Sequence, residues 1–253
     1  MKISIITGTY NSVLTISDTL KSIQNQSYPN IEHIIVDGAS KDSTLKIVAK
    51  FPHVAKVISE PDQGIYDAMN KGIKAATGDI IGILNSDDFF PNDRIVQQIV
   101  DGFDKDTDCI FGDVAFVNPD NLNKIVRYYS AADWHPDKFK KGYMPPHPSF
   151  YVRKSFYEKL GLYQTDYTIA ADYELLIRML HKHKLNYNYL PLQIVTMRTG
   201  GVSTKNIKSR YILNKEIVRA CAENDISTNM FYLSLKYGSK IFEYLQPHKK
   251  ASL

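Results

Sequence analysis

Short apolar runs alternate with segments of helical spacing from the start of the chain to about Asp88. Each run is almost continuously hydrophobic, which is typical of strands that are buried on both faces of a parallel sheet. The runs predict strands at Ile3–Thr7, Ile31–Val36, Val54–Ser59 and Ile80–Leu84. The spacing between them predicts helices at Val13–Gln24, Ser43–Phe51 and Ile65–Ala76. This alternation predicts an α/β fold with a mostly parallel sheet flanked by helices.

Beyond Asp88 the pattern becomes irregular. The stretch Ala131–Pro148 has no clear period and several prolines, so we expect a long loop near a site. The other elements expected here are a helix at Pro91–Gly102, antiparallel strands at Cys109–Val117 and Lys124–Tyr129, a strand at Phe150–Val152, a helix at Ala171–His183, a strand at Tyr189–Met197, and amphipathic helices at about Asn206–Glu223 and Ser227–Leu245. We expect one α/β domain over residues 1–200 and a basic helical extension over 201–253.

Three of the predicted strands end in small polar loops, Thr7–Asn11, Asp37–Asp42 and Asn85–Asp88. In an open parallel sheet, ligands bind beyond the carboxyl ends of the strands, so these loops are candidates for one site. Asp37 directly follows an apolar strand, where its carboxylate can accept a hydrogen bond from a nucleoside; its alternative role is to cap the next helix. The adjacent carboxylates of Asp87 and Asp88 favour a divalent metal with oxygen ligands, although an acidic turn would read the same way.

The motifs that are missing narrow the class of nucleotide site. No Gly-x-Gly-x-x-Gly follows the first strand and no Gly-Lys-Ser/Thr occurs, which disfavours a dinucleotide fold and a P-loop. Without a glycine cradle, a pyrophosphate needs a cation, which the Asp87-Asp88 loop could hold. A nucleotidyltransferase would want a basic, glycine-rich first loop, whereas Thr7–Asn11 has no basic residue. A non-catalytic module that binds sugars or nucleotides stays a third alternative.

Several ordered motifs resemble the family 2 inverting glycosyltransferases with the GT-A fold. They are Ile3–Asn11, Ile34–Thr44, Glu60–Gly72 and Ala76–Asp79, and the resemblance spans roughly residues 1–200. It is nearest to the bacterial sugar transferases that build O-antigen, capsule and related polysaccharides. The resemblance implies a UDP-sugar donor and a lipid-linked diphosphate saccharide as acceptor. The sugar would be a hexose: glucose, galactose or an N-acetylhexosamine.

The resemblance also assigns the donor site. Thr7, Thr9 and Asp37 match positions that hold the nucleoside. The loop Asn85-Ser86-Asp87-Asp88 matches the Asp-x-Asp motif that binds Mn²⁺ or Mg²⁺ on the diphosphate. Its first acid is replaced by Asn85, a neutral oxygen donor, so Asp87 is the expected direct ligand, with Ser86 and Asp88 as neighbours.

Further residues of the motifs are expected around the diphosphate and the donor sugar. Asp67, Asn70 and Lys71 share one face of a predicted helix, where a solvated helix edge is the alternative. His147 resembles a His-x-x-Phe motif near the metal, although a structural histidine fits a proline-rich loop as well. Arg198 begins Arg198–Ser203, which resembles a closing loop with an arginine near phosphate.

Asp172 is the candidate catalytic residue. The segment Ala170–Arg178 matches the family's acidic motif at a helix start, whose aspartate is the general base. An acceptor hydroxyl must lose its proton as it attacks the anomeric carbon, and a single displacement inverts that carbon. From the residues alone, Asp172 could equally be a helix N-cap.

Composition adds a location. The two cysteines, Cys109 and Cys221, lie in unlike contexts, which favours a reduced, cytoplasmic compartment. No apolar run is long enough for a membrane span, and the start is too short for a signal peptide. Residues 201–253 hold nine Lys/Arg against four Asp/Glu, hence +5, whereas the rest of the chain has 22 against 23, hence −1. This asymmetry favours peripheral binding to an anionic membrane, or packing on the core or in a homodimer; nucleic acid is not expected as a partner.

Overall fold

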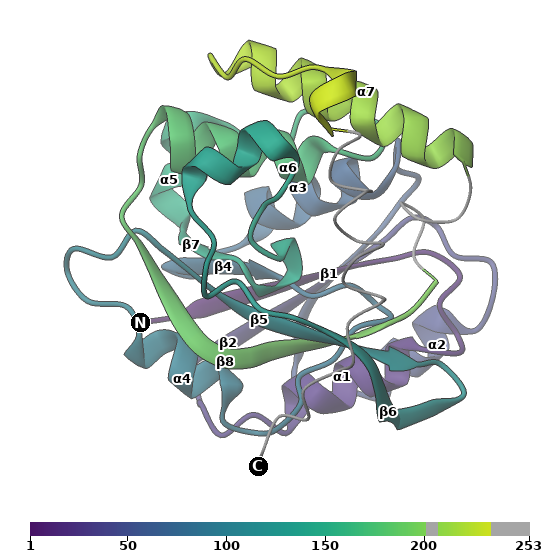
Figure 1. Ribbon diagram of the computed structural model, residues 1–253. Coiled ribbons are helices and arrows are strands. Elements are labelled where there is room, and N and C mark those ends of the chain that lie inside the picture. The colour runs from purple at the N-terminus through teal and green to yellow at the C-terminus, as the bar shows by residue number, and fades with distance from the viewer. Residues whose placement is uncertain (201–206, 234–253) are drawn as a thin grey trace.

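The computed structural model describes residues 1–200 and 207–233. Within these ranges one eight-stranded sheet runs through the molecule (Figure 1). Its strands are β1 (Ile3–Thr9), β2 (Ile31–Asp37), β3 (Val54–Ser59), β4 (Ile80–Ile83), β5 (Cys109–Asn118), β6 (Asn121–Tyr129), β7 (Tyr151–Arg153) and β8 (Tyr187–Arg198). All four strands predicted in the first half are present, with ends within two residues of the prediction.

The sheet is parallel in its first half and mixed in its second. Strand β1 pairs with β2 and β4, and β2 pairs with β3, all in parallel. Strand β7 then pairs antiparallel with both β4 and β5, so β5 runs in the same direction as β4. On β5, the antiparallel partner β6 and the parallel partner β8 lie along opposite edges. The carboxyl ends of β1, β2 and β4 therefore meet at one edge of the sheet.

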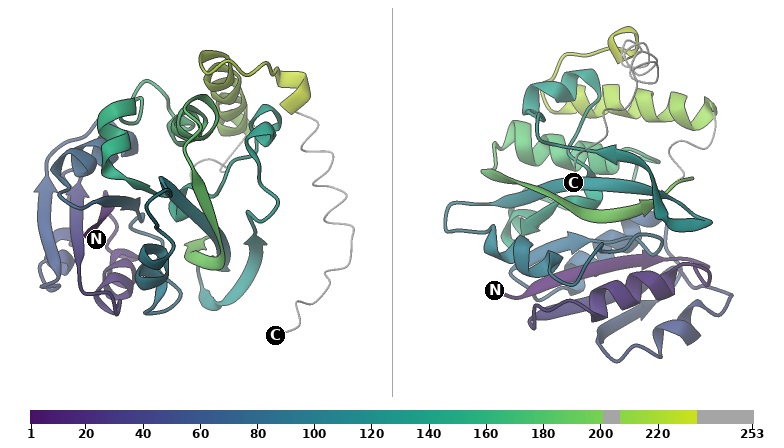
Figure 2. Two further views of the ribbon diagram at one scale, coloured as in Figure 1. Left: turned by 90° about the vertical axis from the view of Figure 1, so that its left-hand side faces the viewer. Right: turned by 60° about the horizontal axis from the view of Figure 1, so that its bottom comes forward.

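Helices cover both faces of the sheet, as the continuous apolar strands predicted (Figure 2). One face packs against α1, α2 and α4 through residues such as Ile23, Val48 and Ile99. The other packs against α3, α5, α6 and α7 through residues such as Met69 and Leu176. The bounds are α1 (Ile16–Gln24), α2 (Thr44–Val48), α3 (Ile65–Ala75), α4 (Ile95–Asp101), α5 (Lys154–Leu160), α6 (Ala171–Ile177) and α7 (Ile207–Glu223).

Some predicted boundaries and elements were wrong. Helices α1 and α4 begin three to four residues later than predicted, because turns at 11–15 and 91–94 precede them. Helix α5 was not predicted, and the helix predicted at Ala171–His183 continues after Ile177 as a π-helical segment, Arg178–Lys182. The stretch expected to be a long loop contains short 3₁₀ helices at Pro136–Lys141 and His147–Ser149, and it buries Trp134 and Phe139 in the core.

The C-terminal extension is only partly described. Helix α7 packs on α6 and buries Ile217, Ala220 and Cys221, which agrees with the alternative that this segment packs on the core. The second predicted helix, Ser227–Leu245, lies mostly outside the described residues, of which the last ones, 230–233, are helical. The boundary at residue 200 stays a prediction.

Candidate active site

The loops after β1, β2 and β4 interlock at one edge of the sheet. The backbone N–H of Asn11 donates to Ser40 Oγ over 2.8 Å, and the backbone N–H of Lys41 donates to Asn11 Oδ1 over 2.8 Å. Ser12 Oγ lies 2.9 Å from Ser86 Oγ and so joins the first loop to the third. Asn11 and Ala39 have φ values of 50° and 61°, a left-handed conformation that is uncommon for side chains other than glycine and clusters at functional sites.

Two predicted nucleoside residues leave buried acceptor atoms without a partner. Asp37 is fully buried, and its Oδ2 accepts from the Ser40 backbone N–H (3.0 Å) and from Ser59 Oγ (2.7 Å). Its Oδ1 and the Oγ1 of Thr9 have no hydrogen-bond partner among the described residues. Because an unpaired buried acceptor costs about 1–3 kcal/mol, these atoms are suited to a ligand. Thr7 differs, since its Oγ1 lies 3.0 Å from His33 Nε2 inside the protein.

The alternative role of Asp37 as a helix cap is wrong. The residue before α2 is Ser43, and the backbone N–H of Thr44 bonds to Asp42 Oδ1 over 2.9 Å. Asp37 instead fixes the turn at Ser40. The adjacent Gly38 is tightly enclosed, because a Cβ there would lie 2.4 Å from Asp62 Oδ2. The loop between β3 and α3 therefore touches the loop after β2.

The loop after β4 presents carboxylates in two different environments. Asp88 is buried, and burial together with the nearby charge of Asp87 raises the pKa of Asp88 well above its ordinary value. Asp88 Oδ2 accepts from Asn85 Nδ2 over 3.1 Å, whereas Asn85 Oδ1 is buried without a partner. The side chain of Asp87 is exposed. One orphaned amide oxygen and two carboxylates match the oxygen ligands of Mg²⁺ or Mn²⁺.

Arg198, at the end of β8, contacts the acidic loop after β4 and holds it in place. A two-residue bridge between Phe89 and Thr196 brings β8 alongside the segment that follows β4. The Arg198 guanidinium donates to the Asp87 carbonyl and to Asp18, and it lies 5.3 Å from the centre of the Phe89 ring. Of the predicted loop beyond Arg198, Thr199 and Gly200 are described and residues 201–203 lie outside the described residues. The observed role of Arg198 is to hold the loop and to place positive charge beside it.

His147 does not belong to a preformed group of metal ligands. The described residues contain no group of three His, Cys, Asp or Glu side chains that could hold a metal. His147 Nε2 lies 2.5 Å from Tyr163 Oη, so ligation by this residue would have to use Nδ1. Burial lowers the pKa of His147, and the charge of Asp172 opposes that shift, which places His147 close to Asp172. The predicted metal role of His147 stays untested.

The three residues predicted on one helix face divide between two roles. Lys71 Nζ pairs with Asp67 (3.3 Å) and Glu60 (3.0 Å), so its charge and that of Asp67 are matched within the protein. Asn70 is buried and points elsewhere: its amide donates to the Tyr163 carbonyl over 2.8 Å and accepts from the Tyr163 N–H over 3.0 Å. Asn70 therefore fixes the irregular segment that carries Tyr163.

Asp172 lies in the first turn of α6 and is partly buried. The cap of this helix is Ala170, so the alternative that Asp172 is an N-cap is wrong. Asp172 Oδ1 accepts from the Tyr173 N–H (2.8 Å) and lies 3.4 Å from Tyr66 Oη. Burial raises the pKa of Asp172, while the nearby His147 acts in the opposite direction. A carboxylate with a raised pKa is a stronger base than an exposed one.

The sequence did not reveal the residue that fixes the segment before Asp172. Glu216 on α7 accepts three consecutive backbone N–H groups, from Thr168 (2.7 Å), Ile169 (2.8 Å) and Ala170 (2.9 Å). Beside it, Arg219 binds Asp166 and lies 4.2 Å from the centre of the Tyr167 ring. No local motif marks Glu216, because its partners lie more than 40 residues away in the chain.

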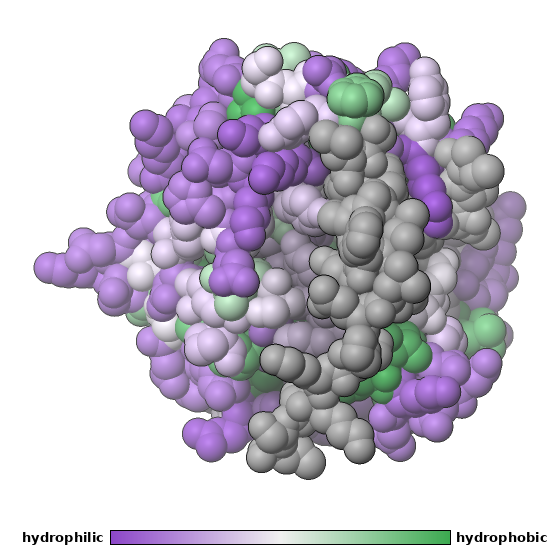
Figure 3. All heavy atoms as spheres, in the orientation of Figure 1, coloured by the Kyte–Doolittle hydropathy of each residue, from purple (hydrophilic) through white to green (hydrophobic). Residues whose placement is uncertain are grey.

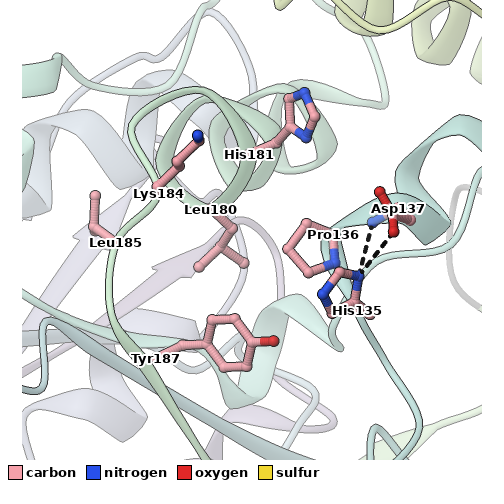
Figure 4. A pocket seen from close by; sticks show the side chains of 8 residues that line it. All are labelled: His135, Pro136, Asp137, Leu180, His181, Lys184, Leu185 and Tyr187. Atoms are coloured by element: carbon pink, nitrogen blue, oxygen red, sulfur yellow. Dashed lines mark hydrogen bonds and ion pairs between the residues drawn. The ribbon is translucent and has the colours of Figure 1, made fainter.

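One surface hollow is remote from these loops. It has a volume of about 550 Å³ and is lined by residues that include His135, His181, Lys184 and Tyr187 (Figure 4). Tyr187 is the first residue of β8, which runs in the same direction as β4. The hollow therefore lies toward the amino ends of these strands, at the edge opposite the candidate site.

Comparison with known proteins agrees with this architecture. Residues 4–160 match Glycosyl transferase family 2. An uncharacterized glycosyltransferase of Mycobacterium tuberculosis (strain H37Rv) is 34% identical over 179 residues, 70% of this chain and 68% of the relative. A PGL/p-HBAD biosynthesis glycosyltransferase of M. tuberculosis (strain H37Ra) is 27% identical and covers 83% of this chain and 82% of its own.

Solved structures share the fold. S. aureus TarS in complex with UDP-GlcNAc superposes with a TM-score of 0.69 at 17% identity, over 90% of this chain and 68% of that one. Against a longer TarS chain, this protein spans 41% of the length. The mannosyltransferase PcManGT of Pyrobaculum calidifontis, in complex with GDP-Man and Mn²⁺, has a TM-score of 0.59 at 17% identity, over 96% and 80% of the two chains.

The fold and the family match together define a glycosyltransferase with the GT-A fold, as the sequence predicted. The chain belongs to glycosyl transferase family 2.

Proposed function

We propose that the protein is an inverting, metal-assisted hexosyltransferase that uses a UDP-sugar. The observation that carries the proposal is the pair of unsatisfied buried acceptors, Asp37 Oδ1 and Thr9 Oγ1, at the same sheet edge as the Asn85–Asp88 loop. Asp37 would accept the N–H of a uracil base. The fold shared with TarS, which was solved with UDP-GlcNAc, supports this assignment.

Asp172 performs the proton transfer in this proposal. The acceptor hydroxyl loses its proton to Asp172 as its oxygen forms a bond to the anomeric carbon, and the bond from that carbon to the UDP oxygen breaks on the opposite face. The anomeric carbon is thereby inverted, and the electron pair of the broken bond leaves with UDP. The hydroxyl group of Tyr66 lies 3.4 Å from Asp172 Oδ1, so this tyrosine packs beside the carboxylate.

Asn85, Asp87 and Asp88 would hold a divalent cation beside the diphosphate. Bound Mn²⁺ or Mg²⁺ would stabilise the negative charge on the departing UDP. A structural neighbour of this fold, PcManGT, was solved with Mn²⁺, which supports the choice of metal. Arg198 holds the Asp87 carbonyl, and its charge offsets part of the repulsion between Asp87 and Asp88.

The acceptor is proposed to be a lipid-linked diphosphate saccharide in cell-surface polysaccharide synthesis, such as O-antigen or capsule. The motifs in residues 60–79 carry this part of the proposal.

A thermal-shift panel tests the donor and the metal together. UDP-sugars are expected to raise the Tm of the wild-type protein more than GDP- or dTDP-sugars do, and to do so more strongly with Mn²⁺ than without it. Asp87→Ala should weaken the UDP-sugar affinity measured with Mn²⁺ by about 10- to 100-fold, because an exposed metal ligand is lost without a change in the core.

Asp93→Ala is the matched control, since Asp93 is exposed and lies outside the loop. It should leave the affinity unchanged. A wild-type protein that prefers GDP-sugars would overturn the uridine assignment. An Asp87→Ala protein with normal affinity in Mn²⁺ would overturn the metal assignment.

The enzyme is further proposed to bind the cytoplasmic membrane peripherally through its C-terminal helices. No helix in the described ranges could cross a bilayer. The exposed side chains of α7 include Lys208, Arg210, Tyr211 and Lys215, which suit an anionic lipid surface. Hydrophilic side chains cover much of the visible face that is not drawn in grey (Figure 3).

Vesicle binding tests this surface. A Lys208→Ala/Lys215→Ala protein should bind phosphatidylglycerol vesicles about 30-fold more weakly, because each lysine near an anionic surface contributes about 1 kcal/mol. Lys46→Ala/Lys50→Ala on the α2 side, where both lysines are also exposed, should bind normally. Unchanged vesicle binding after deletion of 227–253 would exclude a contribution from the terminal segment. If the Lys208→Ala/Lys215→Ala protein binds vesicles as well as the Lys46→Ala/Lys50→Ala protein does, a contribution from the lysines of α7 is excluded.

A further inference from the structure

A second, smaller cavity lies between the start of α3 and the segment that precedes Asp172. Its volume is about 270 Å³, and it is lined by residues 63–67 on one side and 165–168 on the other. This volume lies just below the usual range for small-molecule sites, about 300–1,000 Å³. The cavity is large enough for one sugar ring and too small for an oligosaccharide.

The cavity adjoins the proposed catalytic base. Tyr66 lines it, and the hydroxyl group of Tyr66 donates to the Ile169 carbonyl and lies 3.4 Å from Asp172 Oδ1. Thr168, on the opposite wall, lies four residues before Asp172. A ligand in this cavity would therefore be separated from the base by a single tyrosine side chain.

The lining favours an uncharged, hydroxyl-rich ligand. It offers two carboxylates, Asp67 and Asp166, the hydroxyl groups of Thr165 and Thr168, and an amide, Gln63. Lys71 pairs with Asp67 and Arg219 pairs with Asp166, but neither cation is among the lining residues. Carboxylate and amide oxygens accept hydrogen bonds from sugar hydroxyls, whereas a phosphate or a uronic acid would meet two carboxylates and no cation in the lining.

Both walls of the cavity are held in place before any ligand binds. The wall at 165–168 continues into the three backbone N–H groups that Glu216 accepts. On the opposite wall, the Gln63 N–H donates to Asp67 Oδ2 over 3.1 Å and the Gly64 N–H donates to Asp62 Oδ1 over 3.0 Å. A preformed site loses little conformational entropy when it binds a ligand.

We propose that this cavity is a subsite for an uncharged sugar unit of the acceptor, next to the unit whose hydroxyl group is attacked. The proposal rests on the glycosyl transfer proposed above and extends it to acceptor selection. The subsite lies beside the base rather than among the strand-end loops, so it contributes to the acceptor KM and leaves UDP binding unaffected. This proposal gives Asp67 to the acceptor, whereas the motif resemblance placed it beside the donor sugar.

Ligand-observed NMR with a panel of methyl glycosides tests the subsite. Saturation transfer from the wild-type protein, with UDP and Mn²⁺ present, would be measured for methyl glucoside, galactoside, mannoside, N-acetylglucosaminide and glucuronide. At least one of the four neutral glycosides is expected to receive saturation, and the glucuronide is expected to receive none. Thr168→Trp places a large side chain at the cavity and should reduce the signal at least five-fold.

Two controls separate the possible failures. Thr168→Trp should bind UDP as the wild-type protein does, which shows that it is folded, and Asn123→Trp on the distant β6 should keep the glycoside signal. If UDP binds but no neutral glycoside does, or if Thr168→Trp keeps the signal, the subsite is refuted and the donor assignment stands. If the wild-type protein binds no uridine nucleotide, the proposed function itself fails.

Discussion

Asp172→Asn is expected to lower kcat for sugar transfer by about 10²- to 10⁴-fold, the usual contribution of a general base. The amide keeps the size of the carboxylate, and its oxygen can still accept from the Tyr173 N–H, so the fold of α6 is preserved. What it loses is the ability to take a proton from the acceptor hydroxyl. The Kd for the UDP-sugar should stay within about two-fold, because the described hydrogen bonds of this carboxylate go to the Tyr173 N–H and Tyr66 Oη and not to the loops after β1, β2 and β4.

Asp120→Asn is the matched control for this substitution, since Asp120 is an exposed aspartate in the β5–β6 turn. It should leave both kcat and Kd unchanged. Radiolabelled transfer assays and calorimetric titration with the UDP-sugar measure the two quantities separately. An Asp172→Asn enzyme that turns over at a near-normal rate would remove Asp172 from the mechanism.

The pH dependence of the same reaction follows from the environment of Asp172. Because burial raises its pKa, the carboxyl stays protonated to a higher pH than an exposed aspartate does. The protonated form cannot act as a base, so kcat/KM should fall on the acid side at a pH above about 4, the ordinary aspartate value. In the Asp172→Asn enzyme, the residual activity should no longer show this fall of kcat/KM at acid pH.

The strands were predictable because consecutive apolar residues indicate a strand that is buried on both faces. The runs from Ile3, Ile31 and Ile80 are apolar on both faces, since helices cover both sides of the sheet. Their polar ends were visible for the same reason: Asp37 and Asn85 interrupt apolar runs. Parallel pairing then gathers these ends at one edge, so the meeting of the three loops, where the donor is proposed to bind, could be predicted from the sequence.

The surroundings of the candidate base Asp172 could not be predicted in this way, because they depend on contacts between residues far apart in the chain. Helix α5 is short, and its seven residues carry too few apolar positions for a clear helical period. The insertion of β7 between β4 and β5 leaves no local mark on either strand. Tyr163, which joins Asn70 to His147, lies in an irregular segment. Asp172 could be named as a base only through the resemblance to a known family.

Glu216→Gln is expected to lower kcat by about 10- to 100-fold and to destabilise the protein by about 2 kcal/mol, or about 4–8 °C in Tm. Oε1 accepts one backbone N–H and Oε2 accepts two, and a glutamine would place an N–H donor against at least one of them. The segment that leads into Asp172 would then shift, and the base would lose its alignment with the acceptor. Kinetics at saturating donor and a thermal melt measure the two effects.

Loss of positioning and loss of stability can be separated. If Glu216 positions the base, the variant assayed well below its Tm should keep its donor KM, lose kcat and show a shifted acid limb. Glu158→Gln, which removes an exposed carboxylate paired with Lys154, should change none of these quantities. A Glu216→Gln enzyme with a lower Tm but normal kcat and an unshifted acid limb would mean that α7 only braces the fold. The expected result would instead make α7, although it lies beyond the matched family region, a working part of the active site.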